Sequence, residues 1–170
     1  DYLKVASLAN LAHVHQTDEG QWNARGDPTE IAIQVFASRF KWNRLEHTGG
    51  DSPAWKQLAE FPFDSDVKKM SVIFEETASS KKFVFTKGAV ERVIYSCTRV
   101  YNDESEAGVD LDDDYREEIL ANMESLAAMG LRVLALASKE YDGPSPSKGE
   151  DLDRESIENG LTFRGLVGLY

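Results

Sequence analysis

Three side chains of the sequence belong to types that recognise an anionic ligand with an aromatic ring. Phe63 follows Pro62, and an aromatic face of this kind can stack on a purine for about 1–3 kcal/mol per base. Lys87 precedes Gly88, whose missing side chain lets a backbone and a ligand approach closely. Arg132 carries a planar guanidinium suited to phosphate oxygens. On residue type alone, a core phenylalanine and an ordinary strand-end lysine stay open as alternatives.

Helix-start signals surround a fourth candidate, Glu30. Asp27 suits the N-cap position, Pro28 suits the first helical position, and Glu30 falls at N3, where it can complete a capping box. This pattern predicts a helix after Asp27 whose core-facing stripe consists of Ala32, Val35, Phe36 and Phe40. The capping box accounts fully for Glu30 without any ligand.

Self-contained catalytic motifs are absent from the sequence. It has neither the Walker A pattern nor the glycine-rich dinucleotide fingerprint, so any bound nucleotide must be held by another element. It also lacks the Gly-x-Ser-x-Gly elbow of hydrolases. Cys97 is the only cysteine, which excludes an internal disulfide and is typical of a reducing, cytosolic setting. We therefore assign no catalytic residue and no metal ligand.

The elements that would position these residues follow from the spacing of apolar positions. Helical spacing predicts further helices at residues 2–15, 89–95 and 112–129, the last followed by Gly130 as its C′ residue. Strands are predicted at residues 70–75, 83–86, 98–101, 131–139 and 161–170. The first two strands form an antiparallel hairpin, and regular strand–helix alternation is missing. We therefore expect an α+β fold with a mixed, mainly antiparallel β-sheet flanked by helices.

Length and charge limit the possible partners. The 170 residues suit one domain, and a formal charge of −11 disfavours nucleic acid as a partner. The acidity is local, because residues 103–118 carry −8 and residues 140–158 carry −5, which leaves +2 on the remainder. An anionic ligand can therefore bind the body of the chain. No apolar run approaches the roughly 18–20 residues that span a bilayer, so we expect no direct membrane contact.

Four motifs in order carry a family resemblance. They are residues 26–30 (GDPTE), 61–72 (FPFDSDVKKMSV), 87–91 (KGAVE) and 129–135 (MGLRVLA). Together they closely resemble the nucleotide-binding (N) domain of P-type cation-transporting ATPases, and the first and third are most similar to the fungal sodium-exporting (type IID) pumps. The resemblance covers most of residues 1–170, so we expect a single nucleotide-binding domain over this range, excised from a larger pump.

The resemblance implies that seven residues bind ATP, namely Glu30, Phe63, Lys68, Lys87, Gly88, Arg132 and Leu134. It implies that Phe63 stacks on adenine and that Lys87 lines the deep part of the pocket. It also places Glu30 near the adenine amino group, a role that stays open beside helix capping. Arg132 would contact the phosphates, and Leu134, on the same strand face, would form an apolar wall.

One position departs from the related calcium pumps. They carry an arginine two residues after the stacking phenylalanine, where this chain has Ser65, so we place no phosphate contact there. Lys68, five residues after Phe63, keeps the family spacing and is expected in the pocket. Without the resemblance, Lys68 would be interpreted as an exposed strand lysine.

The resemblance also implies a function. The domain would bind ATP, with Mg²⁺ carried by the nucleotide, and present the γ-phosphate to an aspartate in a separate phosphorylation domain. The pump would export a cation, Na⁺ or Na⁺ and K⁺, with this domain on the cytosolic side of a membrane, expected to be the plasma membrane. The phosphorylatable Asp-Lys-Thr-Gly-Thr segment is absent from these residues, so this chain alone would not complete the cycle.

The expected partners are ATP and the phosphorylation and actuator domains of the same pump, and the fragment is expected to be monomeric. We also expect residues 1 and 170 to lie close together, because the family inserts this domain between two parts of the phosphorylation domain. One alternative is the N domain of another P-type pump, such as a Ca²⁺ ATPase. Another, of a different class, is an acidic protein-interaction module that binds no nucleotide.

Overall fold

The structure is a computed structural model that describes residues 2–102, 105–143 and 153–169. The helices are α1 (Tyr2–Leu8), α2 (Pro28–Arg39), α3 (Arg44–Thr48), α4 (Val90–Val93), α5 (Asp113–Ala128) and α6 (Arg154–Ile157), with a 3₁₀ turn η1 at Ile94–Ser96. The strands are β1 (His13–Gln16), β2 (Trp22–Arg25), β3 (Trp55–Asp64), β4 (Lys69–Glu76), β5 (Lys82–Ala89), β6 (Cys97–Asn102), β7 (Ser105–Asp110), β8 (Arg132–Tyr141) and β9 (Leu161–Leu169).

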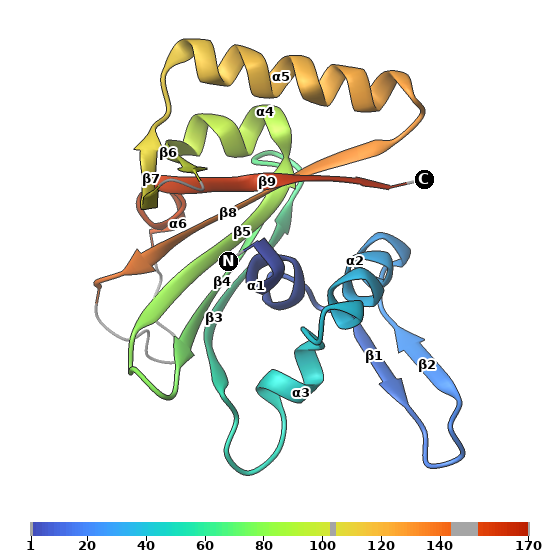
Figure 1. The fold of residues 1–170 in the computed structure, drawn as a ribbon. Coiled ribbons are helices and arrows are strands. Elements are labelled where there is room, and N and C mark those ends of the chain that lie inside the picture. The colour runs from blue at the N-terminus through green and yellow to red at the C-terminus, as the bar shows by residue number, and fades with distance from the viewer. Residues whose placement is uncertain (1, 103–104, 144–152, 170) are drawn as a thin grey trace.

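A seven-stranded sheet of order β3-β4-β5-β8-β9-β6-β7 forms the centre of the fold. Its neighbouring strands run antiparallel, except for the parallel pair β6 and β9. Figure 1 shows α4 and α5 on one side of this sheet and α1 and α2 on the other. The predicted fold class, an α+β fold with a mixed, mainly antiparallel sheet, is confirmed.

The hairpin of β4 and β5 is confirmed, and its alternation separates two cores. Met70, Val72, Phe74 and Phe85 belong to a buried cluster that also includes residues of α1, and we call this side the α1 face. Ile73 and Val84, from the intervening positions, belong to a second cluster with residues of α4, and we call this side the α4 face. Successive strand residues point to opposite sides of the sheet, so alternate residues of β4 and β5 contribute to the two cores.

The opening helix is shorter than predicted, and this corrects the expectation for residues 2–15. The helix α1 ends at Leu8, and the chain continues into β1, which pairs with β2. Asn10 competes with the helix, because its Oδ1 accepts from the Ala12 amide at 2.8 Å while its Nδ2 donates to the Glu30 carbonyl at 2.9 Å. Such side-chain-to-backbone bonds offer the chain an alternative to helical pairing.

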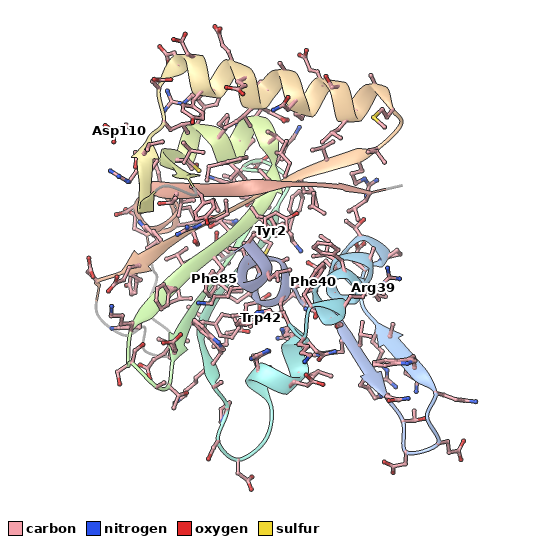
Figure 2. All side chains as sticks on the ribbon, in the orientation of Figure 1. Tyr2, Arg39, Phe40, Trp42, Phe85 and Asp110 are labelled. Carbon is pink, nitrogen blue, oxygen red and sulfur yellow. The ribbon has the colours of Figure 1, made fainter. Side chains whose placement is uncertain are left out.

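The start of α2 is confirmed, but its buried face differs from the prediction. Asp27 caps the helix by accepting from the Thr29 and Glu30 amides, and Pro28 occupies the first turn. The buried side chains of α2 are Ile33, Gln34 and Ala37, while the predicted stripe of Ala32, Val35, Phe36 and Phe40 is exposed. Figure 2 marks Phe40 beside Arg39 at the end of α2. The pattern misleads because α1 packs on the side of α2 that carries Ile33.

The other predicted elements agree with the structure within one or two residues, whereas α3, α6, β1, β2, β3 and β7 are not among the predicted elements. Asp112 caps α5, whose C-terminal Gly130 has a φ of +82°, and β8 follows. Of the helices among the described residues, none has the length and apolar character that crossing a bilayer requires. The expectation for the two chain ends falls on residues 1 and 170, which lie outside the described residues. Among the described residues, the Tyr2 hydroxyl of α1 donates a 2.7 Å hydrogen bond to the Leu166 carbonyl of β9.

Candidate functional site

A cavity of about 600 Å³ opens on the α1 face, where α2 begins and β3, β4, β5 and β8 lie side by side. Its volume is within the range of small-molecule sites. The structure brings all seven residues predicted from the sequence into its lining: Glu30, Phe63, Lys68, Lys87, Gly88, Arg132 and Leu134. Their roles in binding remain predictions, but four sequence segments converge on one pocket.

A β-bulge in β3 turns Phe63 toward this cavity. Phe61 pairs with Ser71, and Asp64 pairs with Lys69, so β3 contains one extra residue between these two pairs. Phe61 packs against the core of the α4 face, and strict alternation would send Phe63 to that face as well. The extra residue reverses the alternation, and Phe63 lines the cavity with 63% of its surface exposed. The alternative of a core phenylalanine is therefore wrong.

Lys87 and Glu30 form an ion pair in the depth of the cavity. The Lys87 Nζ lies 2.9 Å from Glu30 Oε1, and the two side chains are 6% and 17% exposed. Burial lowers the pKa of Lys87 below its ordinary value, and the charge and hydrogen bond of Glu30 oppose this shift. The other oxygen of Glu30 accepts from the Leu11 amide at 2.9 Å. The Glu30 carboxylate is therefore engaged by Lys87 and Leu11, which disfavours the capping box, one of the two roles left open for this residue.

Arg132 lies at the rim of the cavity beside the N-terminus of α2. Its Nη1 donates to Thr29 Oγ1 at 3.1 Å, which orients the guanidinium. Leu134, two residues further along β8, is half-buried against the same core as Met70. A second hollow of about 390 Å³ adjoins this rim and shares Thr29 and Arg132 with the first. A helix N-terminus and a guanidinium together favour an anion at this end of the site.

The backbone around Gly88 lies close to the backbone of Lys68. Lys68 lies in the β3–β4 turn with a φ of +55°, and its carbonyl accepts from the Ala89 amide at 3.0 Å. A Cβ added at Gly88 would lie 2.4 Å from the Lys68 carbonyl oxygen and 2.9 Å from Lys69 Cα. Gly88 therefore allows β5 to approach the backbone of the neighbouring strand, whereas the sequence suggested that it allows a ligand to approach. Gly88 allows the turn that carries Lys68 to lie against β5.

Several lining residues were not selected from the sequence. They are Leu11, Gly26, Asp27, Thr29, Met70 and Ala89. Asp27 and Thr29 belong to the same motif as Glu30, and Met70 belongs to the same apolar alternation as Val72 and Phe74. The sequence therefore held a weak indication for Asp27, Thr29 and Met70. Leu11 had none, because the predicted opening helix was wrong there. No cluster of three His, Cys, Asp or Glu side chains suited to a metal occurs among residues 2–102, 105–143 and 153–169.

Comparison with known proteins adds a relationship to this geometry. Residues 1–170 match the family described as P-type ATPase, cytoplasmic domain N. The sodium/potassium exporting P-type ATPase cta3 of Schizosaccharomyces pombe is 41% identical over 168 residues, which cover 99% of this chain and 15% of that protein. The sodium/potassium exporting P-type ATPase 1 of Saccharomyces cerevisiae is 34% identical over 195 residues, covering 99% of this chain and 18% of that protein.

A more distant relative is the calcium-transporting ATPase 1 of Bacillus cereus. It is 30% identical over 165 residues, which cover 95% of this chain and 17% of that protein. The chain therefore spans less than a fifth of the length of each of these relatives. The similarity concerns one cytoplasmic domain within much longer pumps.

Proposed function

Because this chain belongs to the family of P-type ATPase cytoplasmic N domains, we propose that it binds ATP in the cavity of the α1 face. The observation that carries the proposal is the convergence on this cavity of an exposed aromatic ring, a buried lysine and a rim arginine. Phe63 stacks on the adenine, Lys87 lies at the deep end, and Arg132 holds the phosphates. The triphosphate leaves the cavity past Thr29 and the N-terminus of α2.

The chemistry of each group supports this orientation of the nucleotide. Phe63 is largely exposed, which leaves a ring face available for stacking. The Glu30 carboxylate is an acceptor, and an adenine amino group is a donor, so a base at the deep end meets a complementary group. Arg132 donates from a planar fork and suits phosphate oxygens. The apolar wall is completed by Leu134 and Met70.

The catalytic contribution of such a domain is positioning. Holding ATP in one orientation presents its γ-phosphate to an aspartate in a separate phosphorylation domain, and positioning with electrostatics supplies most of the acceleration of phosphoryl transfer. Mg²⁺ arrives bound to the nucleotide and neutralises phosphate charge. The partners are ATP and the phosphorylation and actuator domains of the same pump, on the cytosolic side of the membrane.

The names of the relatives support a proposal for the transported ion. Two of them bear the name of sodium/potassium exporters and match nearly all of this chain, so export of Na⁺, or of Na⁺ and K⁺, is the proposed task of the whole pump. A calcium pump domain is the second candidate, because a calcium-transporting ATPase matches 95% of the chain at 30% identity.

Calorimetric titration with ATP tests the binding proposal. The wild-type chain is compared with Phe63→Ala and with Phe40→Ala, which removes an exposed phenylalanine from the end of α2. Loss of one stacking contact predicts a Kd about 5- to 150-fold higher for Phe63→Ala. Phe40→Ala should bind like the wild type, because Phe40 does not line the cavity. Absence of wild-type binding at millimolar ATP would refute the proposal.

A further inference from the structure

On the opposite side of the sheet from the cavity, one arginine joins three separate segments. Arg154, the first residue of α6, donates through Nη1 to the Pro62 carbonyl at 3.0 Å and through Nη2 to the Lys69 carbonyl at 2.5 Å. Its Nε donates to Glu158 Oε1, one turn further along. We call these three hydrogen bonds the Arg154 clamp.

The clamp spans the bulge that turns Phe63 toward the cavity. Pro62 lies in the bulged part of β3, between the pairs that Phe61 and Asp64 make with β4, and Lys69 is the first residue of β4. A bulge breaks the regular ladder of hydrogen bonds and leaves backbone groups without strand partners. The Arg154 guanidinium donates to one backbone carbonyl on each of the two strands across this irregular stretch. It also lies over the Phe61 ring, with 5.9 Å between the guanidinium carbon and the ring centre.

A buried carboxylate fixes the clamp. Glu158 is only 3% exposed, and its other oxygen accepts from the Ser71 hydroxyl. Ser71 shares a 2.7 Å hydrogen bond with Thr86, its cross-strand partner. A charge this deeply buried requires a paired and hydrogen-bonded environment, and Arg154 provides the opposite charge. The Arg154 guanidinium is thereby held in one place.

The hydrogen bonds of Arg154, Glu158, Ser71 and Thr86 reach a cross-strand pair that is next to a pair of the cavity lining. Ser71 and Thr86 face α6, whereas the adjacent cross-strand pair, Met70 and Lys87, faces the cavity. Arg154 itself does not line the cavity. Any effect that it has on a ligand there must therefore pass through the strand backbone that it holds, at Pro62 beside Phe63 and at Lys69 beside Lys68 and Met70.

We propose that Arg154, held by Glu158, is a positioning residue for nucleotide binding, and that it acts by fixing the bulge that presents Phe63 to the base. The proposal rests on the proposed ATP-binding function. Supporting residues that lock the geometry of a binding group contribute to affinity without touching the ligand. This role gives α6, which contributes no residue to the cavity, a part in recognition of the base.

A double-mutant cycle between Arg154 and Phe63 tests the proposal, with ATP affinity measured by calorimetry. Arg154→Met should raise the Kd about three- to tenfold, because the ring loses its fixed position but remains present. In the Phe63→Ala background the same substitution should change the Kd less than about twofold. Arg39→Met, on the exposed end of α2, is the matched control and should bind like the wild type.

Arg154→Lys covers the case in which Arg154→Met does not fold. Lysine keeps the positive charge beside Glu158, but its single nitrogen cannot span the carbonyls of both strands, so we expect similar weakening. Wild-type affinity in the folded variant would overturn the proposal, and so would equal weakening with and without the Phe63 ring. If the wild type binds ATP and the variants bind equally well, only this proposal fails. If the wild type does not bind, the proposed function fails with it.

Discussion

The Glu30–Lys87 ion pair offers a prediction whose size follows from its burial. Glu30→Gln removes the negative charge but keeps the shape of the side chain. The amide has one acceptor oxygen, whereas the carboxylate accepts from both the Leu11 amide and Lys87 Nζ. One of these two donors therefore loses its acceptor, and the Lys87 charge remains buried with 6% of its side chain exposed.

Removing one partner of a fully buried ion pair costs about 3–5 kcal/mol. Glu30 retains some contact with water, with 17% of its side chain exposed, so we expect a smaller loss of about 2–3 kcal/mol in the free energy of unfolding at pH 7. For a chain of this length, that loss lowers the melting temperature by about 4–12 °C. Urea unfolding followed by circular dichroism measures it, and Glu19→Gln in the exposed β1–β2 turn is the matched control.

The pH dependence of the free energy of unfolding tests the same ion pair in a second way. Burial holds the pKa of Lys87 below its ordinary value of 10.5, so between the two values the unfolded chain binds more protons and stability rises with pH. Glu30→Gln removes the main influences that oppose this shift, so the pKa of Lys87 falls further. The deficit of the variant should shrink as pH rises toward 10.5, because neutral Lys87 needs no counter-charge. A deficit below about 0.5 kcal/mol at pH 7, or one that does not change with pH, would refute the reasoning.

Three other predictions concern positions with clear local causes. Gly88→Ala should lose about 1–3 kcal/mol in urea unfolding, because its Cβ meets the Lys68 carbonyl at 2.4 Å, and ATP binding should weaken with it. Gly130→Ala should lose about 1–2 kcal/mol through its φ of +82° alone, because no atom lies within 4 Å of the added Cβ; unchanged stability would contradict this. The Cys97 thiol, buried and with its pKa raised to about 12, should not react with a disulfide reagent at pH 8 until the chain is unfolded. Its native state holds the proton longer, so this group should lower stability as pH rises from 9 to 12.

Local signals in the sequence predicted the elements that depend on local physics. Alternation gave the β4–β5 hairpin, Asp27 and Pro28 marked the start of α2, and Gly130 marked the end of α5. Each of these features is decided within a few residues by capping, backbone freedom or the two-residue period of a strand. They could therefore be identified without knowledge of the tertiary contacts.

Features that depend on distant contacts could not be identified in this way. Glu30 meets Lys87 across 57 positions, so its capping role was a sound local prediction that a tertiary ion pair overrode. The buried face of α2 is set by its packing on α1, which composition does not reveal. The bulge that exposes Phe63 is stabilised by Arg154 from 92 positions away. The candidate site was selected through a family resemblance, whereas its internal geometry came only from the structure.

ATP binding in the cavity of the α1 face is the proposed function on which the role of Arg154 also depends. The most direct test is a titration of the ¹⁵N-labelled chain with ATP, followed by amide chemical shifts in NMR. We predict that the largest shifts fall on Glu30, Phe63, Lys87 and Arg132, while amides of α5, on the opposite face of the sheet, remain unchanged. Unperturbed amides at these four residues in millimolar ATP, or shifts concentrated on α5, would contradict the claim.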